Sequence, residues 1–178
     1  MFSLFGKKEF KPKIVDRVFI SSKAKINAIL EKIQHQPDII LITWFEESYS
    51  LLEQLIQSNN LKAEIFMAGE IAAHHIQNKA VLFSEHYALA IKERELLERL
   101  QIREALFYSA LDEPLFRHFG GDKIIAIMER MGLSENEAIE HTMITNAIKN
   151  AQEKISREIA LEHSALSQSE WFSKNILK

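Results

Sequence analysis

Short apolar runs alternate with amphipathic segments along about the first 110 residues, and this alternation is the feature that most limits the fold. The clearest run is DIILIT at residues 38–43, which is continuously apolar and bounded by turn residues. Such a run is typical of a strand buried on both faces of a parallel sheet. Strands and helices that alternate in this way indicate an α/β fold with right-handed crossovers.

The same pattern predicts the order of the elements. We expect strands at 15–21, 38–43, 63–68, 80–84 and 105–109, and helices at 23–34, 47–58, 71–76 and 92–101. Ser21 or Ser22 is expected to cap the first helix, because a hydroxyl oxygen can accept a bond from an unpaired N–H of the first turn. The second helix is expected to turn four apolar side chains inward: Leu51, Leu52, Leu55 and Ile56.

Beyond residue 111 the pattern becomes helical. Pro114 allows a helical turn to start at Asp112 or Glu113, and Asp122 is expected to cap a helix that ends near residue 131. The spacing of Ser134 and Glu137 fits a capping box at the start of another helix. We expect three parts: a flexible segment at 1–13, an α/β core at 14–121 and a helical extension at 122–178 packed on the core.

One long helix is expected at about 142–163, with isoleucines recurring every three or four residues. Its first half, at Ile144, is expected to lie on the core, and its second half, from Ile155 onward, to reach beyond it unless the chain folds back. Trp171 and Phe172 would then cover the second half or meet a second copy of the chain; we favour covering.

Composition excludes several classes. The 178 residues are 47% hydrophobic and 26% charged, which is typical of one globular domain. Cysteine is absent, and no histidine pair has the spacing of ligands on one helix face, so neither a disulfide nor a metal site is expected. The net charge of −3 gives no general affinity for nucleic acid. We find no secretory signal and no apolar run long enough to span a membrane, which favours the cytoplasm.

Residues 108–154 carry the most specific pattern, YSALDEPLFRHFGGDKIIAIMERMGLSENEAIEHTMITNAIKNAQEK. This run resembles the end of the second motor lobe and the start of the helical scaffold of SecA, the ATPase motor of bacterial preprotein export. The resemblance implies a RecA-like, P-loop-NTPase-like sheet, that is, a degenerate second helicase lobe with a helical C-terminal extension. It also implies structural roles for Arg117, Gly120, Gly121, Asp122, Glu140, His141 and Gln152.

The nucleotide motifs of that family are missing. No G-x-x-x-x-G-K-[ST] loop is present, and the glycine-rich and arginine-rich motifs that precede the matching strand in SecA are absent. We therefore expect no ATP hydrolysis by the chain alone and no cofactor.

Polar residues follow two of the expected strands, at the edge where ligands bind in open α/β sheets. This candidate rim comprises Thr43, Trp44, Glu46, Ser48, Glu85 and His86. The alternative is a loop whose aromatic side chains cover the sheet. Gly120, Gly121 and Asp122 could likewise start an anion-binding helix, but we favour a structural junction.

Three functions remain open. The first is a non-catalytic pseudo-lobe, an interaction or regulatory module that binds the protein-export motor or another ATPase. The second is a small-molecule-binding domain or an enzyme that uses Glu46, Ser48, Glu85 and His86. The third is a module that forms a homo-oligomer through the long C-terminal helix.

Overall fold

The computed structural model describes residues 10–130, 134, 137–140 and 142–176. Most of the expected flexible segment, residues 1–9, lies outside the described residues, as does His141. Of the remaining residues of that segment, Lys13 already opens the first strand.

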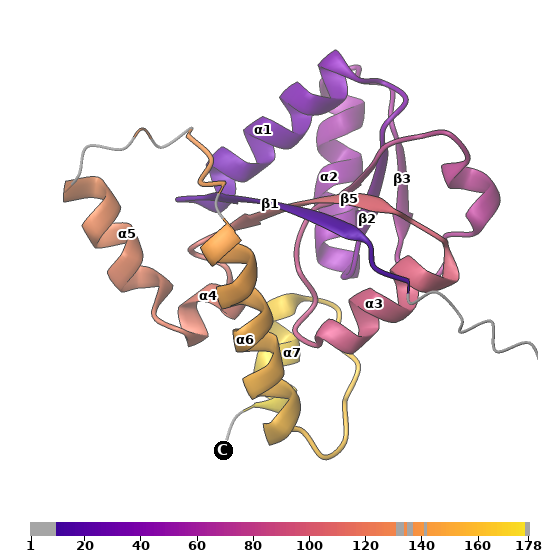
Figure 1. Ribbon diagram of the computed structural model, residues 1–178. Coiled ribbons are helices and arrows are strands. Elements are labelled where there is room, and N and C mark those ends of the chain that lie inside the picture. Colours follow the sequence, from indigo (N-terminus) through magenta and orange to yellow (C-terminus); the bar gives the residue numbers. More distant parts are fainter. Residues whose placement is uncertain (1–9, 131–133, 135–136, 141, 177–178) are drawn as a thin grey trace, which may run out of the picture.

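A parallel five-stranded sheet forms the centre of the described structure (Figure 1). Its strands are β1 (Lys13–Phe19), β2 (Ile40–Thr43), β3 (Glu64–Met67), β4 (Val81–Phe83) and β5 (Glu104–Ala110). The order across the sheet is β1-β5-β4-β2-β3, and every neighbouring pair is parallel. The α/β class predicted from the sequence is therefore confirmed, and the helix-flanked parallel sheet is consistent with a RecA-like lobe.

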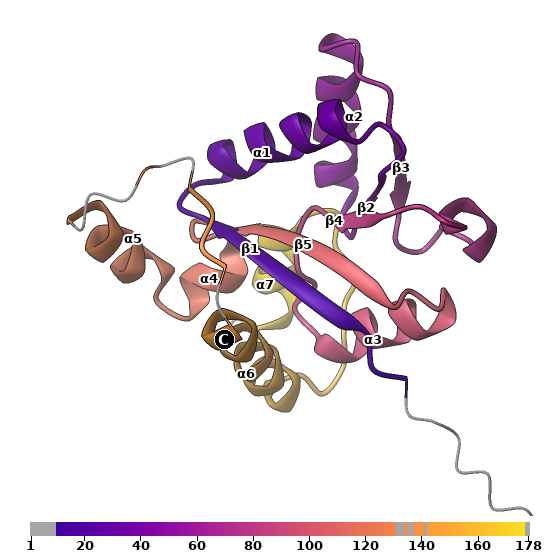
Figure 2. The same ribbon diagram turned by 45° about the horizontal axis from the view of Figure 1, so that its top comes forward.

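Helices cover both faces of the sheet (Figure 2). On one face, α1 (Ser22–His35) and α2 (Glu46–Ser58) pack on Leu41; on the other, α3 (Ala90–Arg99) packs in the cluster that contains Ile40 and Ile42. Successive strand residues point to opposite faces, so both faces of β2 are apolar and all four of its residues are buried.

The local signals of the first two helices are partly confirmed. Ser21 is the N-cap of α1, and its Oγ accepts a hydrogen bond of 3.1 Å from the N–H of Ala24. In α2, Leu52 and Ile56 are buried, but Leu51 is 44% exposed, so the inward orientation expected for Leu51 is wrong. The expected helix at 71–76 is the short 3₁₀ helix η1 (Ala73–Ile76).

The Gly120–Gly121 junction connects α4 (Pro114–His118) to α5 (Gly121–Arg130). Gly120 has φ +88°, a conformation that side chains disfavour. A Cβ on Gly121 would lie 2.3 Å from the carbonyl oxygen of Leu111. Because α5 begins at Gly121, Asp122 lies inside the first turn of this helix and does not cap it. Gly121 is the residue whose backbone approaches the carbonyl oxygen of Leu111 too closely for a side chain.

The segment before the last long helix differs from the prediction. Ser134, Glu137 and Ala138 are not helical, so the expected helix after Ser134 does not form in the described residues. Instead, Ile139 makes an isolated antiparallel bridge to Val18, with hydrogen bonds of 2.8 and 3.2 Å. The outer edge of β1 has backbone N–H and C=O groups that no other strand of the described structure pairs, and Ile139 binds to them. A capping pattern reports only on neighbouring residues, so it does not predict this pairing.

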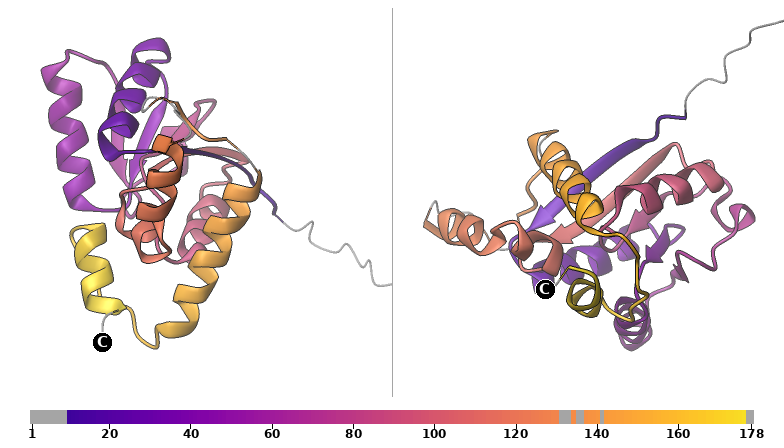
Figure 3. Two further views of the ribbon diagram at one scale, coloured as in Figure 1. Left: turned by 90° about the vertical axis from the view of Figure 1, so that its left-hand side faces the viewer. Right: turned by 90° about the horizontal axis from the view of Figure 1, so that it is seen from below.

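The long helix is α6 (Thr142–Glu158), and it ends five residues before the expected boundary at His163. The chain then reverses direction into α7 (Gln168–Asn175), which runs back beside α4 (Figure 3). Trp171 is fully buried and Phe172 is 8% exposed, which confirms that these aromatic side chains fold back onto the chain. Among the described residues, no helix has the length and apolarity needed to cross a bilayer.

The first half of α6 lies on the core beside β1, as expected, and the second half is also buried, because the chain folds back after it. Ile155 is fully buried, whereas Ile144 is half-buried. Ile148 and Ile155 share a core cluster with Val18, Leu89 and Trp171. Because Ile155 packs in the cluster that holds Leu89 and Trp171, the second half of α6 is the more enclosed one.

Candidate binding site at the carboxyl edge of the sheet

The carboxyl ends of β1, β2, β4 and β5 meet at one edge of the sheet, where the polar residues predicted from the sequence were expected to gather. At this edge begin α1, after β1, and α2, after β2. Helix N-termini carry unpaired N–H groups and partial positive charge, so they are common anion sites.

Each of these two helix starts is occupied by a carboxylate of the protein itself. Asp112 accepts bonds from the backbone N–H of Ser22 (3.0 Å) and from its hydroxyl (2.7 Å). Glu85 accepts a bond of 3.1 Å from the N–H of Trp44 and one of 2.5 Å from the hydroxyl of Ser48. Carboxyl groups of the protein itself therefore fill positions that a phosphate group would otherwise use.

A buried lysine lies between these carboxylates. The ammonium group of Lys25 donates a bond of 2.8 Å to the carbonyl oxygen of Ser84 and forms an ion pair with Glu113. Burial opposes the charged form of Lys25, but the attraction of Glu113 and Glu85 outweighs burial and raises its pKa. The lysine is thus held as a cation whose charge is already matched by carboxylates.

Glu85 is a buried carboxyl group whose pKa is affected by Lys25. Burial raises the pKa of Glu85 above its usual value, while Lys25 and the hydrogen bond from Ser48 act in the opposite direction. A carboxyl with a raised pKa at the edge of a cavity is suited to binding a cation or to exchanging a proton.

A cavity of about 220 Å³ opens beside these groups. Its wall combines the starts of α1, α2, α4 and α7 with the end of β4, and Lys25 is the cation among the described residues that line it. We call it the edge cavity; it is lined by Ser22, Lys25, Ile26, Glu47, Ser48, Leu51, Leu52, Ser84, Glu85, Glu113, Pro114, Gln168 and Ser169.

The C-terminal helix closes this site. Gln168, near the start of α7, donates a bond of 3.0 Å to the carbonyl oxygen of His86 and accepts one of 3.1 Å from the N–H of Leu115. Gln152 of α6 donates a bond of 2.7 Å to the carbonyl oxygen of Tyr87. The extension thereby fixes the loop after β4 from two sides.

His86 points away from Glu85, into the core. Its ring lies 2.9 Å from Asp16 and 2.9 Å from Glu93, and all three side chains are buried. Burial lowers the pKa of the imidazole, but the attraction of Glu93 and the hydrogen bonds to Asp16 and Glu93 outweigh it and raise the pKa to about 10. His86 is therefore a charged structural element at neutral pH.

The structure brings together some of the predicted rim residues and separates others. Trp44, Ser48 and Glu85 are linked by hydrogen bonds, and the Thr43 hydroxyl lies 3.3 Å from the sulfur of Met67. Glu46 is exposed in the first turn of α2 and is not among the residues that line the edge cavity. His86 belongs to the separate buried cluster.

Among the described residues, those assigned structural roles from the family pattern do not line the edge cavity. Arg117 lies 3.5 Å from Asp122 on the surface, and Glu140 forms an ion pair with Arg17 of β1.

The sequence reasoning missed four members of the site: Lys25, Asp112, Glu113 and Gln168. A signal existed for Lys25, because it stands four and eight residues before Ile29 and Ile33 on the inward face of α1. A lysine in register with buried isoleucines must find a buried partner. That partner, Glu113, follows β5 and is 88 positions away along the chain.

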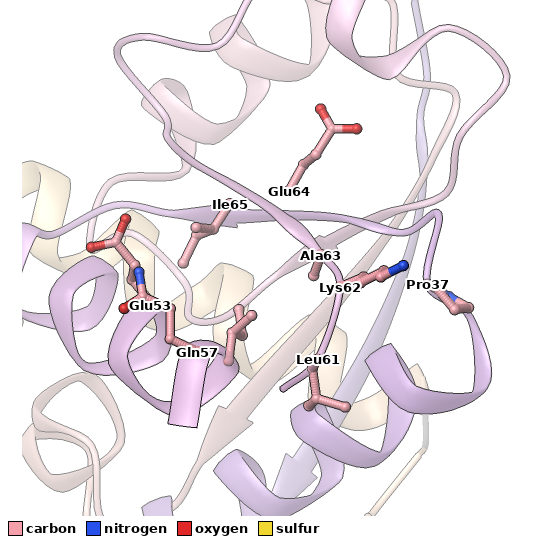
Figure 4. A pocket seen from close by; sticks show the side chains of 9 residues that line it. Pro37, Glu53, Gln57, Leu61, Lys62, Ala63, Glu64 and Ile65 are labelled. Atoms are coloured by element: carbon pink, nitrogen blue, oxygen red, sulfur yellow. The ribbon is translucent and has the colours of Figure 1, made fainter. Parts of the chain in front are cut away.

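Three other cavities are less suited to chemistry. One of about 370 Å³ is lined by Trp44, Tyr87, Lys92 and Arg99 among others, but Arg99 already donates to the carbonyl oxygens of Ala68 and Ile71. One of about 340 Å³ between α4, α5 and α6 is lined by apolar side chains. The third, of about 470 Å³, is drawn in Figure 4; its Glu53 and Glu64 are engaged with Tyr49 and Lys79.

Comparison with known proteins places the chain beside one family. No protein-family model matches the sequence. Protein translocase subunit SecA of Chlorobaculum tepidum is 29% identical over 184 residues, covering 80% of this chain and 18% of that protein. SecA of Acetivibrio thermocellus is 40% identical over 72 residues (40% of this chain, 8% of that protein), and SecA of Alkaliphilus oremlandii is 51% identical over 49 residues (28% and 6%). The chain therefore resembles SecA and spans about a fifth of the length of its most broadly matched relatives.

Proposed function

We propose that this SecA-related chain is a non-catalytic pseudo-lobe, an interaction or regulatory module that binds another component of protein export instead of hydrolysing nucleotide. The resemblance to SecA supports the link to export. The partner that we propose is the export motor or a related ATPase, in the cytoplasm.

One observation carries the non-catalytic part of the proposal. The starts of α1 and α2, where this kind of sheet offers N–H groups to phosphate, are filled by Asp112 and Glu85. A nucleotide phosphate at this edge would meet these two carboxyl groups and Glu113. The positive charge of Lys25 would not attract it, because that charge is already paired with Glu113. Like charges at such short range disfavour an anionic ligand.

The sequence supports the same conclusion. A phosphate loop and the arginine-rich motif are absent from all 178 residues. Phosphoryl transfer depends on cations that stabilise the negative charge of the transferring group. The helix starts at this edge of the sheet carry the carboxyl groups of Asp112 and Glu85 instead. The division into a core at 14–121 and an extension at 122–178 remains part of this proposal.

The test has two measurements on the purified chain. A fluorescent ATP analogue with magnesium should give no saturable binding and no turnover above a buffer blank. Immobilised chain should bind purified SecA from the same organism, and unrelated ATPases of similar charge serve as the control. Turnover that disappears in the Ser48→Ala variant would contradict the non-catalytic assignment, and absence of SecA binding would contradict the partner.

Small-molecule binding is a second candidate, supported by a specific observation. The indole Nε1 of Trp44 is buried without a hydrogen-bond partner in the described structure, beside the cavity of about 370 Å³. An acceptor on a ligand could satisfy it. Quenching of Trp44 fluorescence in a Trp171→Phe variant would report such a ligand. The enzyme that uses Glu46 and His86 has less support, because neither side chain joins Glu85.

Self-association through α6 also has less support. Ile148 and Ile155 are used within the chain, so the apolar stripe of this helix is largely covered. The molecular mass in solution, measured by light scattering, tests this possibility directly.

A further inference from the structure

Two residues that line the edge cavity each carry a buried oxygen atom that lacks a hydrogen-bond partner among the described residues. Within the described structure, Ser84 Oγ and Glu113 Oε2 make no hydrogen bond, and their residues are 0% and 7% exposed. Both residues line the cavity. A buried carboxylate oxygen without a donor is costly, so an occupant that brings N–H or O–H groups would be stabilised here.

Apolar side chains also line the edge cavity: Ile26, Leu51, Leu52 and Pro114. Leu51 is 44% exposed, so the apolar part of the lining continues to the surface. An occupant that matches both the polar and the apolar lining has an aliphatic stem and a polar end.

The charges define that polar end. Glu47, Glu85 and Glu113 line the edge cavity, and they outnumber Lys25, the one cation among the described residues of its lining. This balance favours a positive group and disfavours a phosphate or carboxylate. The described residues contain no group of three or more histidine or acidic side chains arranged to hold a metal ion, which favours an organic cation over a divalent one.

We propose that the edge cavity binds the cationic side chain of a lysine or arginine from a partner protein, with its ammonium or guanidinium group at Glu113 Oε2 and Ser84 Oγ. The stem lies along Leu51 and Leu52. This proposal rests on the proposed function, because it supplies the anchor through which a protein-binding module recognises its partner. Charge-assisted hydrogen bonds in a buried site are strong enough to make one side chain an anchor.

The test uses small probes and the intact chain. Nα-acetyl-lysine methylamide and Nα-acetyl-arginine methylamide are titrated into the ¹⁵N-labelled protein, with the norleucine derivative as the matched probe that lacks the amine. We expect shifts at the backbone signals of Ser84, Glu85 and Glu113 for at least one of the two cationic probes. A dissociation constant on the order of 1 mM is expected for a single side chain, with norleucine at least about tenfold weaker.

Three variants locate the binding. Ser84→Ala removes the unpartnered hydroxyl but keeps the carbonyl that Lys25 uses, so it should fold normally and weaken the cationic probe about fivefold. Glu113→Gln should weaken it by about tenfold or more. Glu104→Gln, an exposed carboxylate paired with Lys13, should leave binding unchanged.

Two results would overturn the proposal. One is equal binding of norleucine and the cationic probes; the other is no shift at the cavity with either cationic probe at about 20 mM, a concentration 20 times the expected dissociation constant. Cadaverine, a free diamine, distinguishes the source of the cation. If it bound about tenfold more tightly than the lysine and arginine probes, the ligand of the edge cavity would be a small amine and not the side chain of a partner protein. None of these probes involves SecA. Failure of the cavity assignment is therefore distinct from failure of the export link.

Discussion

Asp112 accepts two hydrogen bonds from Ser22, one of 2.7 Å from the hydroxyl and one of 3.0 Å from the backbone N–H. The two residues are 90 positions apart, and the bonds join the end of β5 to the first residue of α1. The carboxylate stabilises the positive end of that helix and holds the place of an external anion.

Replacement of Asp112 by alanine should open this anion site. We expect the free energy of unfolding to fall by about 1–3 kcal/mol, since bonds to a charged group are lost. Inorganic phosphate should then raise the melting temperature of Asp112→Ala more than that of the parent. Asp122→Ala is the control, because Asp122 is exposed in the first turn of α5. Equal responses of Asp112→Ala and the parent to phosphate would show that the carboxylate does not occupy an anion site.

The buried pairs of His86 predict a pH dependence. The pKa of His86 is about 10 in the folded chain and near 6.5 when unfolded, so its ion pairs contribute their full stability below about pH 6.5. That contribution decreases as pH rises and is lost through about pH 10. The difference in unfolding free energy between the parent and His86→Gln should therefore shrink steadily from pH 6.5 to 10, measured by urea titration.

The exposed His163 offers the matched substitution. His163→Gln should leave the pH profile of the parent unchanged. A difference between parent and His86→Gln that stays constant across this range would mean that His86 is not charged in the folded state.

Ile155 and Ile144 lie on the same helix but differ in burial. Ile155→Ala should lower the free energy of unfolding by about 2–5 kcal/mol, because it leaves a cavity beside Trp171 in a closed core. Ile144→Ala should cost clearly less, since Ile144 is half-buried. Urea unfolding at constant m-value gives both numbers. A loss from Ile144→Ala as large as that from Ile155→Ala would refute the enclosure of the second half of α6.

The Gly120–Gly121 junction predicts two different penalties. Gly120→Ala should cost about 1–2 kcal/mol, because its positive φ strains any side chain. Gly121→Ala should cost about 3 kcal/mol, because its Cβ would meet the backbone oxygen of Leu111 and the junction would have to move. Gly69→Ala, with open space around it, should stay within about 0.5 kcal/mol. Thermal melts that rank Gly120 above Gly121 would contradict this geometry.

The sequence by itself determined the class of the fold and the positions of its strands. A run such as residues 38–43 has an apolar residue at nearly every position, and it can be buried only between two layers of helices. Ser21 as a cap acts through the first turn of its own helix, so a local pattern detects it. The resemblance to SecA likewise depends on residue identity and spacing alone.

Only the tertiary structure decided which groups share the edge cavity. Lys25, Ser84, Glu113 and Gln168 come from four distant parts of the chain and meet because parallel strands end at one edge. The tertiary structure also decided the burial of Ile155 in the cluster with Leu89 and Trp171, because a helix's own periodicity identifies its apolar face but not what covers it. Pairing over such separations depends on the whole fold, which no local pattern encodes.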